Sequence, residues 1–396
     1  MSVKTDSREQ RALAAQQRDR GVATLNPGRE DYDEQMRSTW GGPKIKWYNR
    51  AVARYQKFYP KNSDQIALVT GSIGGIGFYV AKALAAVGYT VIIPSRSGLE
   101  ADAEGAKRGI LREFPNAKVV IPKTPLDLGS FPSVRAFGAA IRHSYKKIDR
   151  LCLNAGRGGG VNDAREVTMD GQEAIMQVNA FGHYLLTDEL MPLLRASNDA
   201  RIVSQTSGAR YQAKIAKVDD INGTDAENFN AFDQYCLSKC ANVLFTKCLN
   251  ERLLAYNIHN VTACVSDPGL TSTGVNIQHD LTNSIGMKNI NTNQMHDARG
   301  HHAGDGALPM IVGTITPHAN KNDWFTTDGV DAKTFTEAGH VQDPIERDRN
   351  GTDPLVEANY PREKRESFWR QAKEATGNTL PQEDYETMYD LIDAVC

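Results

Sequence analysis

The hydrophobic and polar positions of this chain alternate in a regular way from residue 66 onward. Short apolar-rich runs predict buried strands, and between them apolar residues recur every three or four positions, as on one face of a helix. The predicted strands are 66–69, 90–93, 118–121, 151–153, 201–204, 261–265 and 323–326. The predicted helices are 78–87, 99–114, 133–145, 171–194, 233–255, 306–312 and 361–376. Such alternation is typical of an α/β protein with a doubly wound parallel sheet.

The ends of the chain depart from this pattern. Residues 1–39 are mostly polar, which predicts an arm, and they contain no apolar core of a signal peptide. Residues 271–303 are rich in Asn, Thr, His and Gly and predict a long loop in which a substrate lid could lie. We therefore expect an N-terminal extension (1–64), a single domain (65–377) and a C-terminal extension (378–396).

A basic and aromatic segment, residues 44–61, lies in the N-terminal extension. It contains no acidic residue, and its cations are Lys44, Lys46, Arg50, Arg54, Lys57 and Lys61. Its apolar and aromatic residues fall on one stripe of a helix: Ile45, Tyr48, Val52, Tyr55 and Tyr59. Such a helix either docks its stripe on the domain, the interpretation we favour, or lies on an anionic membrane surface.

Composition narrows the class of protein. The 396 residues are 40% apolar with a formal net charge of -2, which suits a globular protein and argues against a dedicated nucleic-acid binder. No apolar run approaches the roughly 20 residues of a membrane-spanning helix.

The six cysteines show no Cys-x-x-Cys pair, so we expect free thiols and an intracellular, cytoplasmic protein, with an organelle left open. The histidines show no zinc-site spacing, and we expect no metal.

A glycine-rich turn joins the first predicted strand to the first helix. Gly71, Gly75 and Gly77 follow strand 66–69 directly. Glycine lets the backbone approach phosphates closely, and a helix N-terminus offers unpaired N–H groups. The order strand, turn, helix predicts a site for the pyrophosphate of a dinucleotide.

Tyr235 and Lys239 form a candidate acid–base pair. Residues i and i+4 share one face of a helix, so both side chains can point into one site. A nearby cation lowers the pKa of a tyrosine from about 10, which makes the phenol usable in proton transfer.

Two further polar residues mark the same site. Ser207 follows the fifth strand, where it could donate a hydrogen bond to a substrate oxygen; Thr206 and Ser204 compete for this role. Asn179 lies within a predicted helix, where Asn is disfavoured without a partner. We expect Asn179 to make a structural or catalytic hydrogen bond.

Taken together, these motifs resemble the short-chain dehydrogenase/reductase family, which has a Rossmann fold. The likeness runs from residue 66 to 274 and more weakly to 377. It rests on 70–77, Asp127, Asn154-Ala-Gly156, Asn179, Ser207, Tyr235, Lys239 and Pro268-Gly269. Within the family, 178–187, 237–245 and the long gap between Ser207 and Tyr235 resemble the retinol dehydrogenase and protochlorophyllide reductase branch.

The resemblance implies a role for each matching residue. Tyr235 would be the general acid or base, Lys239 would lower its pKa and hold the nicotinamide ribose, Ser207 would polarise the substrate oxygen, and Asn179 would anchor a water relay. Asp127 would contact the adenine. The full cofactor set implied is Gly71, Ser72, Ile73, Gly75, Ile76, Gly77, Arg96, Asp127, Leu128, Asn154, Ala155, Gly156, Tyr235, Lys239, Pro268, Gly269 and Thr271. The family often has His before Pro-Gly, whereas this chain has Asp267, to which the sequence assigns no effect.

The end of the second strand indicates which dinucleotide binds. Enzymes that prefer NAD usually place Asp or Glu there to bond the ribose 2′-OH. This chain has Ser95-Arg96 at that place, and a guanidinium suits a 2′-phosphate. We therefore expect NADP(H).

The sequence as a whole predicts an NADP(H)-dependent oxidoreductase that transfers hydride between nicotinamide and an apolar carbonyl or alcohol. Two alternatives stay open: a carbon–carbon double-bond reductase of the protochlorophyllide type, and a dinucleotide-binding structural or regulatory subunit. Expected partners are a small-molecule substrate and no nucleic acid. Membrane contact through 44–61, a homodimer and docking in a larger assembly stay open.

Overall fold

The computed structural model describes residues 25–40, 43–58, 64–158, 164–225, 227–271, 273, 301–317, 319–322, 324–326 and 360–377. Most of the predicted 271–303 loop and all of the C-terminal extension lie outside the described residues.

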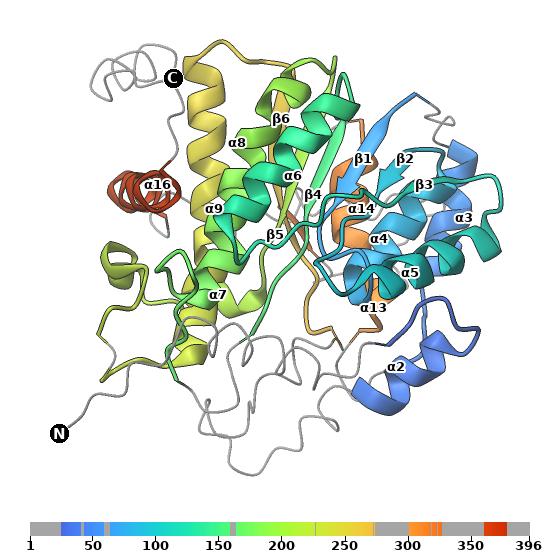
Figure 1. The fold of residues 1–396 in the computed structure, drawn as a ribbon, viewed down its shortest axis with the longest axis horizontal. Helices are drawn as coiled ribbons and strands as arrows, with labels where there is room; N and C mark the ends of the chain where they lie inside the picture. The colour runs from blue at the N-terminus through green and yellow to red at the C-terminus, as the bar shows by residue number, and fades with distance from the viewer. Residues whose placement is uncertain are drawn as a thin grey trace, which may run out of the picture.

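A seven-stranded parallel sheet forms the centre of the molecule, in the order β3-β2-β1-β4-β5-β6-β7. Its strands are β1 Ile66–Val69, β2 Thr90–Ile92, β3 Lys118–Val120, β4 Arg150–Leu153, β5 Ala200–Gln205, β6 Val261–Asp267 and β7 Trp324–Thr326. All seven predicted strands are present. The order reverses between β1 and β4, so the predicted doubly wound α/β architecture is confirmed (Figure 1).

Helices cover both faces of the sheet, because side chains alternate along each strand. Leu68 of β1 packs with the cluster on one face, and Ala67 and Val69 pack with the cluster on the other. The first cluster includes α6 Phe131–Ser144, α8 Gly182–Arg195, α9 Ala231–Ala255 and α16 Arg362–Thr376. The second includes α3 Tyr48–Phe58, α4 Gly75–Ala86, α5 Glu100–Glu113, α13 Ala303–Gly306 and α14 Leu308–Ile315.

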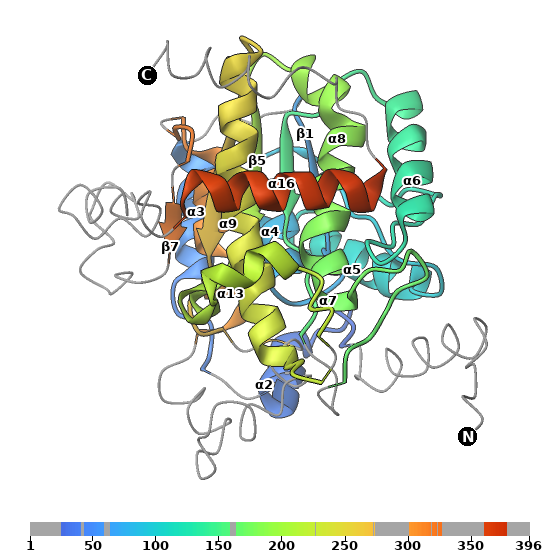
Figure 2. The ribbon, with the colours of Figure 1, turned by 90° about the vertical axis from the view of Figure 1, so that its left-hand side faces the viewer.

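Helix α16 crosses the outside of the first layer (Figure 2). The Trp369 ring packs 4.9 Å from the Tyr184 ring of α8 and 6.2 Å from the Phe245 ring of α9. Both α8 and α9 carry candidate site residues or lie next to them, so α16 fixes the layer that holds the site.

The helix predicted over 171–194 is not one continuous α-helix. It consists of α7 Ala174–Met176, a π-helical turn η1 Gln177–Phe181 and α8. The Asn179 carbonyl accepts hydrogen bonds from the Asn242 amide at 2.7 Å and from the His183 ring at 3.2 Å. Side-chain donors that compete for a helical carbonyl favour such a local π turn, a feature frequent at functional sites.

The N-terminal extension is packed onto the domain. Tyr48, Val52 and Tyr55 of α3 are buried, so this part of the apolar stripe docks as we expected, and Tyr59 lies outside the described residues. Asp305 of α13 accepts hydrogen bonds from the N–H groups of Lys46, Trp47 and Tyr48, each at 2.9 Å. Among the described residues, no helix combines the length and apolar character needed to cross a membrane.

Removing the Asp305 carboxylate should weaken the attachment of α3. Asp305→Ala leaves three N–H groups at the start of α3 without their acceptor and should lower the free energy of unfolding by about 2 kcal/mol. Urea unfolding measures this. The control is Glu104→Ala, which removes an exposed carboxylate within α5, and which should change stability by less than ~0.5 kcal/mol. Equal effects of the two variants would contradict the prediction.

Candidate active site

The turn after β1 needs glycine for two different reasons. Gly71 and Gly75 have φ of +65° and +52°, which side chains with a Cβ rarely adopt. At Gly77, a Cβ would lie 2.2 Å from the Gly71 carbonyl oxygen. The backbone therefore closes tightly at the start of α4, as the glycine spacing predicted.

The same turn has the features of a phosphate site. The helix cap residue Gly74 offers no side chain to the first N–H groups of α4. The Ser72 hydroxyl is buried and, among the described residues, has no hydrogen-bond partner. Unused donors around a glycine cradle fit the pyrophosphate of a dinucleotide.

Thr70 joins this turn to the turn after β4. Its hydroxyl oxygen accepts hydrogen bonds from the N–H groups of Asn154 and Ala155, both at 3.0 Å. The Asn154 amide donates in return to the Thr70 carbonyl at 2.9 Å. The predicted residues 154–156 are thereby held beside the glycine turn, and Thr70, which we had not counted among the site residues, holds them.

His183 extends this contact to Asn179. Its Nδ1 lies 3.2 Å from the Asn179 carbonyl oxygen and its Nε2 lies 3.0 Å from the Thr70 hydroxyl oxygen. Burial lowers the pKa of His183 to about 3, so the ring is neutral. A carbonyl only accepts, so we assign the proton to Nδ1, and Nε2 accepts from Thr70. We missed His183 in the sequence; its spacing of four residues from Asn179 on an apolar helix was the available signal.

Asn179 and Lys239 meet next to Gly156. The Asn179 side chain accepts from Arg157 N–H at 2.8 Å and donates to the Ser238 hydroxyl at 2.9 Å. The Lys239 ammonium donates to the Gln205 carbonyl at 3.2 Å. A Cβ at Gly156 would lie 3.3 Å from Asn179 Oδ1 and 3.4 Å from Lys239 Nζ. Burial lowers the pKa of Lys239 to about 8, and the charge of Asp267 acts in the opposite direction.

Tyr235 and Ser207 lie beside this group. The two side chains are hydrogen-bonded, and Lys239 Nζ lies 5.7 Å from the centre of the Tyr235 ring. Burial raises the pKa of Tyr235 to about 12, although the Ser207 hydrogen bond acts to lower it. The sequence predicted a pKa lowered by Lys239, and this direction was wrong because desolvation outweighs any effect of the cation.

Asp267, which the sequence left without a role, forms a buried ion pair with Arg210. The two residues are 2% and 3% exposed. Arg210 Nη1 also donates to the Ser207 carbonyl at 3.0 Å, and the other Asp267 oxygen accepts from Gly269 N–H at 3.0 Å. The pair therefore ties the turn after β5, which carries Ser207, to the predicted Pro268-Gly269 turn after β6. No spacing in the sequence connects these two residues.

The remaining predicted cofactor residues lie in the turns that follow β2, β3 and β6. Arg96 is exposed in the turn after β2, and Leu128 is buried after β3. The Asp127 carboxylate accepts from Gly129 N–H at 2.8 Å, within its own turn. The buried Thr271 donates to the Pro268 carbonyl at 2.8 Å. Of the predicted site residues, the structure brings together those of 71–77, 154–156, Asn179 and Lys239 in one contact network through Thr70 and His183, with Tyr235 and Ser207 beside it.

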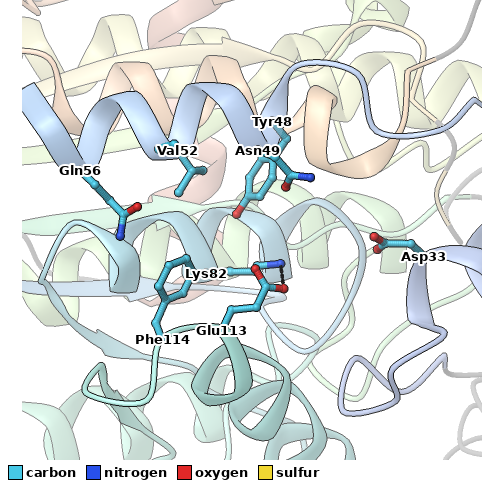
Figure 3. A pocket seen from close by; sticks show the side chains of 9 residues that line it. Asp33, Tyr48, Asn49, Val52, Gln56, Lys82, Glu113 and Phe114 are labelled. Atoms are coloured by element: carbon cyan, nitrogen blue, oxygen red, sulfur yellow. Dashed lines mark hydrogen bonds and ion pairs between the residues drawn. The ribbon is translucent and has the colours of Figure 1, made fainter.

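A cavity of about 400 Å³ lies elsewhere, between the extension and helices α4 and α5 (Figure 3). Its charged lining consists of Asp33, Glu113 and Lys82, and Lys82 forms an ion pair with Glu113. None of the predicted site residues lines it, so its volume is separate from the candidate active site.

Known proteins are similar to this chain over the region that carries these residues. A family model described as short chain dehydrogenase matches residues 65–283. The chain is 35% identical over 221 residues to a polyprenol dehydrogenase from Homo sapiens, covering 55% of this chain and 64% of that protein. It is 35% identical over 206 residues to a retinol dehydrogenase 12 from Bos taurus, covering 52% and 61%. The match therefore spans less than two thirds of either relative.

Two solved structures share the fold. An uncharacterised protein from Mycobacterium Paratuberculosis is 23% identical with a TM-score of 0.59, over 83% of this chain and 98% of that chain. A short chain dehydrogenase from Burkholderia cenocepacia J2315 in complex with NADP is 23% identical with a TM-score of 0.50, over 67% and 97%. At this identity the likeness concerns the fold alone.

The neutral His183 should make stability depend on pH. Unfolded His183 binds a proton near pH 6.5, whereas the folded ring binds one only near about 3, so stability falls as the pH drops below 6.5. His183→Gln removes this proton uptake. Between pH 6.5 and about 3, the free energy of unfolding of the wild type should fall by ~1.4 kcal/mol more per pH unit than that of the variant. Urea unfolding between pH 6.5 and 4 measures both slopes, and parallel curves would refute the assignment.

Proposed function

Because the chain belongs to the short-chain dehydrogenase family, we propose that it is an NADP(H)-dependent oxidoreductase that interconverts an apolar carbonyl and its alcohol. The catalytic domain of this proposal is 65–377. The main support for this proposal is that Asn179, Lys239 and the hydrogen-bonded Ser207–Tyr235 pair lie close together beside the glycine turn. The curated relatives confirm the predicted retinol dehydrogenase-like branch, and their names support an apolar substrate.

The residues divide into a binding part and a proton-transfer part. When bound, the dinucleotide supplies or accepts the hydride. The glycine turn and Ser72 would hold its phosphates, and Arg96 would face the 2′-phosphate. In carbonyl reduction, Tyr235 would donate its proton to the substrate oxygen while Ser207 donates a hydrogen bond to the same oxygen.

Burial gives the two titrating groups suitable protonation states for reduction. With a pKa of about 12, Tyr235 carries its proton at neutral pH and can act as a general acid. With a pKa of about 8, Lys239 is still mainly charged at pH 7, and its charge would stabilise the phenolate that forms as Tyr235 gives up the proton. Asn179 would keep this lysine in place through the 156–157 turn and Ser238.

Loss of the Tyr235 hydroxyl should stop proton transfer while leaving the fold intact. Tyr235→Phe keeps the ring and should lower kcat for carbonyl reduction by at least ~100-fold. The measurement is NADPH oxidation with a panel of apolar ketones and aldehydes, with NADPH affinity measured separately by fluorescence. Tyr256→Phe is the control, because Tyr256 is exposed at the opposite end of α9, 21 residues from Tyr235.

If Tyr235→Phe reduced carbonyls with the kcat of the wild type, proton donation by Tyr235 would be excluded. Double-bond reduction, or a purely binding role, would then move ahead. Wild-type protein that binds neither NADPH nor NADH would refute the oxidoreductase proposal altogether.

Arg96 should decide between the two dinucleotides. Arg96→Asp removes the cation nearest the expected 2′-phosphate and adds a carboxylate that repels it. The Kd for NADPH should rise by tenfold or more, since a hydrogen bond to a charged group is worth ~1.5–3 kcal/mol, while the Kd for NADH should rise far less. Titrating both cofactors tests this, with Arg108→Asp on α5, also exposed, as the control. An equal rise in the Kd for NADPH and for NADH would contradict the preference for NADP(H).

A further inference from the structure

The N-terminal extension reaches the glycine-rich turn through Tyr32. This residue begins helix α2 Tyr32–Trp40, at the lower edge of the molecule in Figure 1. The Tyr32 hydroxyl oxygen accepts a hydrogen bond from Gly75 N–H at 3.0 Å. A Cβ at Gly74 would lie 3.7 Å from the same oxygen. The phenol therefore lies against the first turn of α4, where a dinucleotide phosphate is expected.

Tyr32 is firmly held in this position. It is 3% exposed, and its ring packs edge-on to Phe78 at 5.4 Å and stacks on Tyr79 at 6.4 Å. The neighbouring Asp33 carboxylate accepts a hydrogen bond from the Tyr79 hydroxyl. On the other side, Arg112 of α5 donates to the carbonyls of Gly28 and Arg29, at 3.0 and 3.2 Å. The extension thus presents the phenol in one defined orientation.

The proton of the Tyr32 hydroxyl is available for an acceptor. A phenol has one proton to donate besides its acceptor lone pairs, and the oxygen already accepts from Gly75. No group among the described residues accepts the Tyr32 proton. Burial raises the pKa of Tyr32, so the proton stays on the oxygen at neutral pH.

Other donors at the turn are also without an acceptor. The Ser72 hydroxyl is fully buried and, within the described part of the chain, unpaired. The amides of Ile76 and Gly77 belong to the first turn of α4, where helix geometry provides no acceptor. Two hydroxyls and two amides at one glycine turn, none of which has an acceptor among the described residues, are complementary to an anion.

We infer that Tyr32 is a cofactor-binding residue supplied by the N-terminal extension, and that its hydroxyl donates to a phosphate oxygen of the dinucleotide pyrophosphate at the start of α4. This rests on the proposed dinucleotide-dependent function. The extension thereby completes a site that the domain from residue 65 onward forms only in part, and cofactor binding fixes the extension in return.

A purely structural role for Tyr32 would have a different signature. Tyr48 provides the matched case, because it is also buried, also comes from the extension, and also bonds the α4 backbone, donating to the Tyr79 carbonyl at 2.8 Å. Tyr48 lies one helical turn further along α4, away from the glycine turn. Removing either hydroxyl should cost stability, but only the Tyr32 hydroxyl should affect cofactor affinity.

The test compares Tyr32→Phe and Tyr48→Phe in the full chain. Circular dichroism and thermal unfolding establish that both variants fold, and fluorescence titration gives the Kd for NADPH and for NADH. Tyr32→Phe should raise both values by about 10- to 100-fold, the worth of one hydrogen bond to a charged group. The rise should be the same for both cofactors, unlike that of Arg96→Asp, because the pyrophosphate is common to them. Tyr48→Phe should leave both Kd values unchanged.

A second measurement needs no variant. In the wild type, NADPH should slow amide hydrogen exchange within 29–37, and should have no comparable effect on 48–55. Unchanged affinity in Tyr32→Phe, or equal losses in the two variants, would overturn the inference while leaving the oxidoreductase proposal intact. Selective loss of NADPH affinity would also overturn it, because the contact would then be to the 2′-phosphate. Absence of cofactor binding by the wild type would overturn both.

Discussion

The hydrogen bonds of the Thr70 hydroxyl are the constraint on which the arrangement of the site depends. One oxygen accepts from two backbone N–H groups of the turn after β4 and donates to the buried ring of His183. The glycine turn, the 154–156 turn and the helix of Asn179 are therefore fixed relative to one another by a group that is itself 1% exposed. In a buried position such a network is rigid only if every member is satisfied, and the neutral state of His183 satisfies both of its partners.

Desolvation, more than any neighbouring charge, determines the protonation states at the site. It raises the pKa of Tyr235 and lowers that of Lys239, so each group is pushed toward its neutral form. Asp267 is the main source of opposing charge for Lys239, and Arg210 pairs with this carboxylate. A buried carboxylate is costly unless it is paired. Arg210 provides that pairing and, through the Ser207 carbonyl, also holds the turn that carries the serine.

The described part of the N-terminal extension and the late helix α16 both pack into the core of the domain. The stripe of α3 and the first residues of α2 join the same apolar cluster as α4 and α14, and Asp305 from late in the chain caps the start of α3. On the opposite face, α16 closes the layer formed by α8 and α9. Both faces of the sheet are thus completed by segments remote in sequence from the strands that they cover.

Three features could be predicted from the residues alone: the α/β order, the glycine turn and the placement of Tyr235 and Lys239 on one helix face. These are local properties: apolar periodicity, the conformational freedom of glycine and the i to i+4 spacing are all expressed within a few neighbouring residues. The π turn at Asn179 was not foreseen, because the donors that compete for its carbonyl include Asn242, which lies 63 residues away.

Contacts between distant residues, and the electrostatics that burial creates, depend on how the chain packs in three dimensions. Arg210 and Asp267 are 57 residues apart and Tyr32 and Gly75 are 43 apart, and no local pattern encodes either contact. The direction of the Tyr235 pKa was mispredicted for the same reason. The nearby cation can be read from the spacing, whereas the desolvation that outweighs it depends on how the whole chain packs around the hydroxyl.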